Sequence, residues 1–243
     1  MRLLFILISI QTYLYNCTGM TSQNITENHQ TADNLALHYL IEEPEKKGTK
    51  NKAIILLHGV GSNEQDLFSL AEHLPDDYFI ISPRGQFTLG PGRYAWYNVD
   101  FSTGKPLFNA QQELSSRKVI FDFIKQVKLK YNLDEVYVGG FSQGAIMSYS
   151  IGLLHPQEIK GVIALSGRML DEIKPELTPT EDLKKLKVFI AHGVQDNTLQ
   201  IGYARTAKTY LESLQVVLSS HEYEIGHQIS QAVIADLNKW LAD

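Results

Sequence analysis

Cysteine is almost absent from this chain of 243 residues, in which Cys17 is the only one. A single cysteine cannot form an internal disulfide bond, and it cannot build a metal centre from several thiolates. Long runs of basic residues are also lacking, and the formal net charge is −5. Nucleic-acid binding therefore has no electrostatic support. Internal repeats and low-complexity tracts are missing as well.

The length and the hydrophobic content indicate one sizeable folded domain. A chain of 243 residues suits a single large domain, and 44% hydrophobic residues are enough to build a core. Global disorder is thereby excluded. We expect this folded domain to cover residues 34–243, because residues 18–33 are polar without apolar periodicity and are typical of a flexible tether.

The first residues are typical of an export signal. Arg2 precedes an apolar block over residues 3–10, which is too short for a comfortable membrane span and predicts a secretory signal peptide over residues 1–17. We therefore expect export to the periplasm, to the outside of the cell or to a membrane through a lipid. Residues 14–17 resemble a bacterial lipobox that would attach a lipid to Cys17, although Asn16 departs from its usual small residue. Simple cleavage nearby, or a cytoplasmic protein that starts at Met20, are the alternatives.

The stretch from Val136 to Gly144 predicts a nucleophile elbow. Three β-forming residues lead into Gly140-Phe141-Ser142-Gln143-Gly144, and a small apolar helical run follows. Glycine is needed two residues before and after Ser142, because side chains there would collide with the neighbouring strand and helix. The N–H groups of the helix that starts here point to where negative charge would develop. An ordinary strand–turn–helix corner is the alternative interpretation.

Strands alternate with helices along the whole chain. Residues 53–57 form an apolar run without alternation, which is typical of a central strand covered on both faces. Residues 116–131 show the clearest helical periodicity. A long stretch over residues 86–111 has neither pattern, so we expect an irregular loop that walls a pocket. This alternation predicts an α/β fold with a mostly parallel sheet.

Three residues at predicted strand ends suit nucleophilic catalysis. In open α/β sheets, sites form at the carboxyl ends of strands. The hydroxyl of Ser142 needs a base, and His227 lies between the last predicted strand and the last helix. Asp196, just past another strand, can orient the imidazole. His58 and His192 also follow strands, and we interpret them as hydrogen-bonded histidines that hold loops in shape.

An acyl-transfer site also needs two N–H donors for the oxyanion. The main-chain N–H after the nucleophile belongs to Gln143, and the turn after the early strand offers that of Val60. Trp96 and Phe101 in the long loop, together with Leu199 beyond Asp196, could line the acyl pocket or serve ordinary packing.

In combination, six motifs resemble the phospholipase/carboxylesterase family of α/β-hydrolases. These motifs are Leu57-His58-Gly59-Val60-Gly61-Ser62-Asn63, Pro83-Arg84-Gly85, Gly140-Phe141-Ser142-Gln143-Gly144, Leu165-Ser166-Gly167, His192-Gly193-Val194-Gln195-Asp196 and Gly226-His227. The resemblance implies the α/β-hydrolase fold, with helices on both faces of the sheet and no large lid domain. It also implies a Ser142/Asp196/His227 triad and an oxyanion hole from the main chain of Val60 and Gln143, with no metal and no cofactor.

The function that follows is hydrolysis of carboxylic esters with short to medium acyl chains through an acyl-enzyme. The expected partner is a small-molecule ester or a lipid, and the sequence does not indicate an oligomeric state. An acyl-protein thioesterase or a lysophospholipase is the alternative within the same chemistry. Ser62-Asn63 is closer to the bacterial carboxylesterase branch than to the thioesterase branch. A ligand-binding lipoprotein without catalysis is the alternative from another class.

Overall fold

The structure is a computed structural model that describes residues 35–100 and 107–243. Some expectations concern residues outside these ranges, namely the signal peptide over 1–17, the tether over 18–33, the lipid on Cys17, the alternative start at Met20 and the pocket role of Phe101. No helix in the described ranges has both the length and the apolar character that a membrane span requires.

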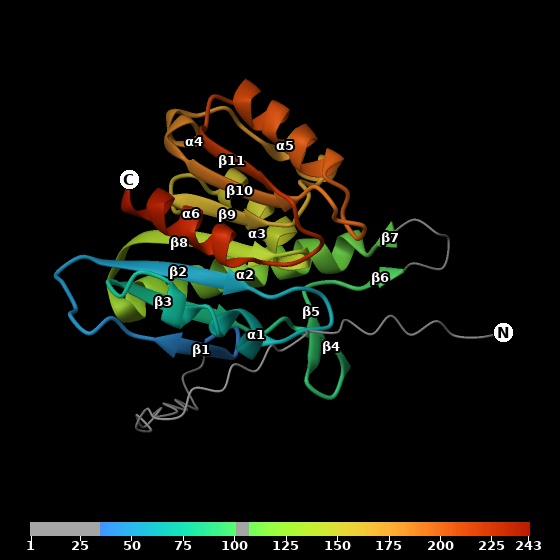
Figure 1. Cartoon of the computed structure of the whole chain (residues 1–243). Coiled ribbons are helices and arrows are strands. Elements are labelled where there is room, and N and C mark those ends of the chain that lie inside the picture. Colours follow the sequence, from blue (N-terminus) through green and yellow to red (C-terminus); the bar gives the residue numbers. More distant parts are fainter. Residues whose placement is uncertain (1–34, 101–106) are drawn as a thin grey trace, which may run out of the picture.

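Seven strands form one central sheet in the order β1-β3-β2-β8-β9-β10-β11 (Figure 1). Only β1 runs antiparallel to its neighbour in this sheet. The strands are β1 (Tyr39–Glu42), β2 (Asn51–Leu57), β3 (Tyr78–Pro83), β8 (Leu133–Phe141), β9 (Gly161–Leu165), β10 (Lys187–Gly193) and β11 (Val217–Tyr223). The predicted mostly parallel α/β fold is confirmed.

Helices cover both faces of the sheet, and α1 and α6 lie in front of it in Figure 1 while α2 and α3 lie behind. The helices are α1 (Glu64–Phe68), α2 (Ala110–Tyr131), α3 (Gln143–Leu154), α4 (Glu181–Lys185), α5 (Gly202–Ser213) and α6 (Gln231–Ala242). Two 3₁₀ segments are η1 (Ala71–His73) and η2 (Asp171–Glu176). No large lid domain lies within the described ranges.

The core has two layers, one on each face of the sheet. Ile54 and Leu56 of β2 pack in the layer that contains Leu237 of α6. Ile55 and Leu57 belong to the opposite layer with the buried faces of α2, α3 and α5. Successive side chains of a strand point to opposite faces, so a strand covered on both sides is apolar at every position. Burial of each such side chain stabilises the fold by roughly 1.5–3 kcal/mol.

The structure differs from expectation in the long stretch that follows β3. Instead of one irregular loop, it contains two short antiparallel pairs, β4 (Phe87–Gly90) with β5 (Arg93–Ala95) and β6 (Val99–Asp100) with β7 (Leu107–Phe108). The turn of the first pair uses Gly92 at a φ of 66°. Strands of two to four residues are too short to show an alternating pattern, so sequence periodicity could not detect them.

The start of α3 packs directly against the end of β2. A Cβ atom at Gly144 would lie 1.7 Å from the carbonyl oxygen of Leu57, and one at Gly140 would lie 2.5 Å from the same oxygen. Both distances are far below van der Waals contact, so only glycine permits this approach of helix and strand. The steric reason given for the glycines around Ser142 therefore holds.

This contact predicts that Gly144→Ala destabilises the protein by about 3 kcal/mol or more, or prevents folding, because β2 and α3 would have to separate. Chemical denaturation followed by circular dichroism measures the change. Gly202→Ala is the matched control: no atom lies within 4 Å of its added Cβ, so its unfolding free energy should change by less than about 1 kcal/mol. Equal stability of the two variants would contradict the steric argument.

Candidate active site

Ser142 occupies a strained backbone conformation between β8 and α3. Its φ of 55° and ψ of −114° are unusual for a residue with a side chain, and such strain costs roughly 1–3 kcal/mol. Its N–H donates to the carbonyl of Leu165 at 2.9 Å, which holds the turn against β9. Serine often caps a helix N-terminus through its hydroxyl, but the Ser142 side chain makes no such hydrogen bond. The hydroxyl is therefore free of a capping role.

Asp196 and His227 form a short hydrogen bond. The Nδ1 atom of His227 lies 2.7 Å from Oδ2 of Asp196, and the carboxylate side chain is completely buried. The other oxygen, Oδ1, accepts the N–H groups of Thr198 and Leu199, each at 2.8 Å. A carboxylate oxygen accepts from a ring N–H, so Nδ1 donates in this bond and Nε2 takes no part in it.

The His227 ring lies beside the nucleophile elbow. Its centroid is 4.7 Å from that of Phe141, the residue immediately before Ser142. The structure thus brings the three candidate catalytic residues to the carboxyl edge of the sheet, in the segments after β8, β10 and β11 (Figure 1).

His192 is a second histidine beside Asp196, and it is fully buried. Its Nε2 lies 2.6 Å from the carbonyl oxygen of Leu199 and 3.4 Å from Oδ2 of Asp196. The shorter contact shows where the N–H points, since a carbonyl oxygen can only accept. His192 thus fixes the turn that positions the carboxylate, in agreement with the structural role expected from the sequence.

The turn from His58 to Gly61 lies next to Ser142. A Cβ at Gly59 would be 3.6 Å from Cβ of Ser142. The turn's own hydrogen bonds use the N–H of Gly61, which donates to Tyr94, and that of Ser62, which donates to Gly59. The N–H of Val60 is in neither bond, and the N–H of Gln143 starts α3, where helices leave donors unpaired. The turn that carries Val60 and the start of α3 therefore both lie next to Ser142, and the oxyanion hole stays a prediction.

His58 holds this turn in place as a neutral imidazole. Its Nδ1 donates to the carbonyl of Gly59 at 2.8 Å, while Nε2 accepts the N–H of Gly85 at 2.9 Å. Burial lowers the pKa of His58 from its ordinary value of 6.5, which favours the neutral form. The turn after β3 and the turn after β2 are thereby joined through one ring.

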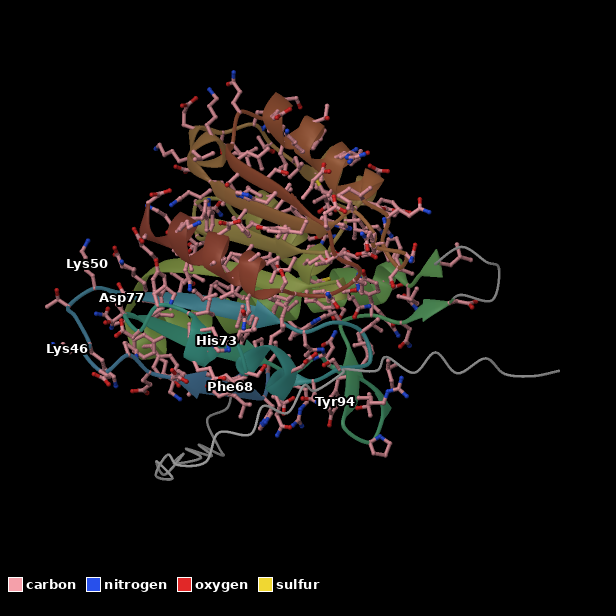
Figure 2. All side chains as sticks on the ribbon, in the orientation of Figure 1. Lys46, Lys50, Phe68, His73, Asp77 and Tyr94 are labelled. Carbon is pink, nitrogen blue, oxygen red and sulfur yellow. The ribbon has the colours of Figure 1, made fainter. Side chains whose placement is uncertain are left out.

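The ion pair between half-buried Arg84 and buried Glu64 supports the same region. Arg84 donates to Glu64 through Nε at 2.7 Å and through Nη2, and its guanidinium lies 4.7 Å from the ring centroid of Tyr94. Burial alone would raise the pKa of Glu64, but hydrogen bonds to its carboxylate and the nearby positive charge of Arg84 together lower that pKa. Tyr94 extends from β5 beside this turn (Figure 2), where its main chain bonds Gly61 and Ser62.

The Gln143 side chain has a structural role that sequence reasoning missed. Its Oε1 accepts the N–H of Trp96 at 2.9 Å, and its Nε2 donates to the carbonyl of Tyr97 at 2.7 Å. This amide is buried and connects the elbow to the segment after β5. The available signal was a polar residue between the nucleophile and the apolar residues 144–147.

The expected pocket residues have mixed outcomes. Trp96 is completely buried, with Nε1 donating to the carbonyl of His58 at 2.9 Å. Trp96 therefore packs beneath the turn from His58 to Gly61 and does not face open space, which favours the packing interpretation. Leu199 positions Asp196 and His192 through its main chain, while its side chain packs against the core.

Within the described ranges, no group of three or more His, Cys, Asp or Glu side chains is arranged to hold a metal ion. The chemistry that the described site offers is that of a hydroxyl, an imidazole, a buried carboxylate and main-chain N–H groups.

Comparison with protein families decides the class of the molecule. A model of the family described as phospholipase/carboxylesterase matches residues 38–243. The chain belongs to this family. The resemblance predicted from the six motifs is confirmed, and so is the prediction of an enzyme of the carboxylesterase/phospholipase type, a class of serine hydrolases.

Individual relatives agree with this family. The chain is 28% identical over 207 residues to acyl-protein thioesterase 1 of Kluyveromyces lactis, covering 78% of this chain and 90% of the relative. Two solved carboxylesterases share the fold. That of Bacillus cereus has a TM-score of 0.73 at 22% identity, over 86% of this chain and 95% of the other. That of Mesorhizobium loti has a TM-score of 0.74 at 23% identity, over 87% and 97%.

The neutral His58 predicts a loss of stability in mild acid. Above pH 6.5 the histidine is neutral in folded and unfolded chains, so its contribution is fully present. As the pH falls below 6.5, the unfolded chain binds a proton first, and stability decreases until the lower folded pKa is passed. The difference in urea unfolding free energy between about pH 7.5 and about pH 5.5 should be smaller in His58→Gln than in the wild type.

His73→Gln is the control for this measurement, because His73 is exposed at the end of η1 (Figure 2). The control should keep the wild-type pH difference. An unchanged difference in His58→Gln would show that His58 is not held neutral.

Proposed function

We propose that the protein hydrolyses carboxylic esters of short to medium acyl chains with Ser142 as nucleophile, His227 as base and Asp196 as the residue that orients His227. One observation carries this proposal: the Asp196–His227 hydrogen bond of 2.7 Å belongs to an imidazole that packs against the elbow residue preceding Ser142. The free Nε2 atom is the nitrogen that a serine hydroxyl requires as a proton acceptor.

The proposed reaction has two steps. The Ser142 oxygen attacks the acyl carbonyl while its proton passes to Nε2 of His227, and the tetrahedral oxyanion accepts N–H groups from Val60 and Gln143. Collapse releases the alcohol, which takes the proton from His227, and leaves an acyl-enzyme. Water then attacks this ester with His227 as base again, which releases the acid and regenerates Ser142. Buried Asp196 stabilises the imidazolium in both steps.

A thioester substrate is the second candidate, supported by the name of the Kluyveromyces lactis relative. The described site does not distinguish an ester from a thioester, because the triad attacks the same carbonyl carbon. A matched chain-length series of oxygen esters and thioesters compares kcat/KM for each acyl group. A preference for thioesters at every length would replace the ester assignment while leaving the proposed triad unchanged.

Ser142→Ala should lower p-nitrophenyl butyrate turnover by about 10³-fold or more, because no other hydroxyl replaces the nucleophile. The variant should also lose labelling by a fluorophosphonate. Its circular dichroism should match that of the wild type. Ser213→Ala, at an exposed serine of α5, is the control and should retain both turnover and labelling. Wild-type protein that is neither labelled nor active would favour the non-catalytic ligand-binding alternative.

We also propose export through the N-terminal segment, which is supported by Arg2 and the apolar block over residues 3–10. Expression of the full chain in a bacterium should yield a mature protein that begins near Cys17. Mass spectrometry of its N-terminus distinguishes simple cleavage from a lipid-modified cysteine, and Cys17→Ala should abolish any lipid mass. An uncleaved protein, or one starting at Met20, would contradict export by this signal.

A further inference from the structure

Arg168 lies in the segment just after β9, next to the candidate active site. It follows Gly167, whose added Cβ would be 2.5 Å from Cβ of Ala145 in the first turn of α3. The backbone that carries Arg168 is therefore in direct contact with the helix that begins immediately after Ser142.

Two aromatic rings from different walls of the site flank the Arg168 guanidinium. Its Cζ atom is 5.8 Å from the ring centroid of Phe108 in β7 and 5.9 Å from that of Tyr203 in α5. Phe108 packs against Tyr97, whose carbonyl accepts a hydrogen bond from the Gln143 side chain. Tyr203 follows the turn that contains Asp196. The charge is thus placed between the segments that border Ser142 on either side.

The positive charge of Arg168 is not neutralised by the protein in the part of the chain that the structure describes. Arg84, Arg117 and Arg205 each pair with glutamate carboxylates. Arg168 is half-buried, and within residues 35–100 and 107–243 its guanidinium makes neither an ion pair nor a hydrogen bond. Burial raises the pKa of Tyr97, and the nearby charge of Arg168 partly opposes that rise.

We propose that Arg168 binds an anionic group on the substrate, so that the enzyme prefers esters whose acyl or alcohol part carries a carboxylate or a phosphate. This inference rests on the proposed function, because Ser142 must attack the ester that Arg168 selects. The N–H groups of the Arg168 guanidinium make no hydrogen bond within the described ranges, and their planar fork matches the geometry of carboxylate and phosphate oxygens. Partial burial lowers the effective dielectric, which strengthens such a contact.

The test compares matched neutral and anionic esters in Arg168→Met. Mono-4-nitrophenyl glutarate carries a free carboxylate, and its methyl ester has the same chain without the charge. The wild type should prefer the anionic ester. Arg168→Met should lower kcat/KM for it by about 10- to 100-fold, mainly through KM, and change kcat/KM for the neutral ester by less than about twofold.

Two further variants separate recognition from structure. Arg205→Met removes a charge of the same type from an exposed position of α5, so it should leave the preference for the anionic ester unchanged. Arg168→Lys keeps the charge but loses the planar fork, so it should lose only part of that preference. Unfolding midpoints are measured for all variants, and Arg168→Lys provides the test if Arg168→Met does not fold.

A second pair of substrates distinguishes the source of the anion. Butyryl glycerol 3-phosphate carries a phosphate on the alcohol side, and monobutyryl glycerol is its neutral counterpart. If Arg168→Met removes the preference for the glutarate, the selected group is a carboxylate on the acyl side. If it removes the preference for the glycerol phosphate, the selected group is a phosphate on the alcohol side.

Two outcomes would overturn the proposal. One is a wild type without preference for either anionic ester. The other is an Arg168→Met variant that slows neutral and anionic esters equally, which would assign Arg168 to packing between the rings. In both cases turnover of the neutral ester persists and the proposed function stands. Failure of that function would instead appear as unchanged neutral-ester turnover in Ser142→Ala.

Discussion

The close contact between the first turn of α3 and the end of β2 is the constraint on which the site depends. The 1.7 Å separation that a Cβ at Gly144 would have from the Leu57 oxygen leaves room for glycine only. This approach places the turn after β2 beside Ser142. The positive φ of Ser142 is the local cost of connecting a central strand to a helix that starts so close to its neighbour.

Asp196 and His227 are held by a second set of main-chain contacts, independent of the elbow. The N–H groups of Val194 and Gln195 donate to the carbonyls of Tyr223 and Ile225 at 2.8 and 3.0 Å. These bonds continue the β10–β11 pairing into the loops, so the segment with Asp196 and the segment with His227 form one unit. Both carboxylate oxygens of buried Asp196 have donors, because Oδ1 accepts the N–H groups of Thr198 and Leu199 and Oδ2 lies 2.7 Å from Nδ1 of His227. The geometry of the pair therefore does not rely on flexible surface side chains.

Features set by local pattern could be predicted from the sequence, while features set by tertiary contact could not. The apolar run of β2, the elbow and the order of the strand-end residues are visible in the chain itself. The helix that was expected from residue 116 begins at Ala110, where the Asn109 side chain caps it by accepting the N–H of Gln112. Its first turn is polar, so apolar periodicity could not show this start. The Gln143 amide and the Arg168 guanidinium contact residues that are distant in the sequence, and sequence periodicity does not predict such contacts.

The candidate catalytic residues and Arg168 are held by different parts of the fold. Ser142, Asp196 and His227 lie on turns that are fixed by close glycine contacts and main-chain hydrogen bonds, so these turns tolerate little change. The Arg168 side chain lies near the rings of Phe108 and Tyr203, and its exchange would leave those turns intact. Proteins of one fold differ in function through the residues of their sites, so a preference among esters can change without a change of the elbow. The proposed preference for anionic esters fits this separation, because within the described ranges no carboxylate pairs with the Arg168 guanidinium.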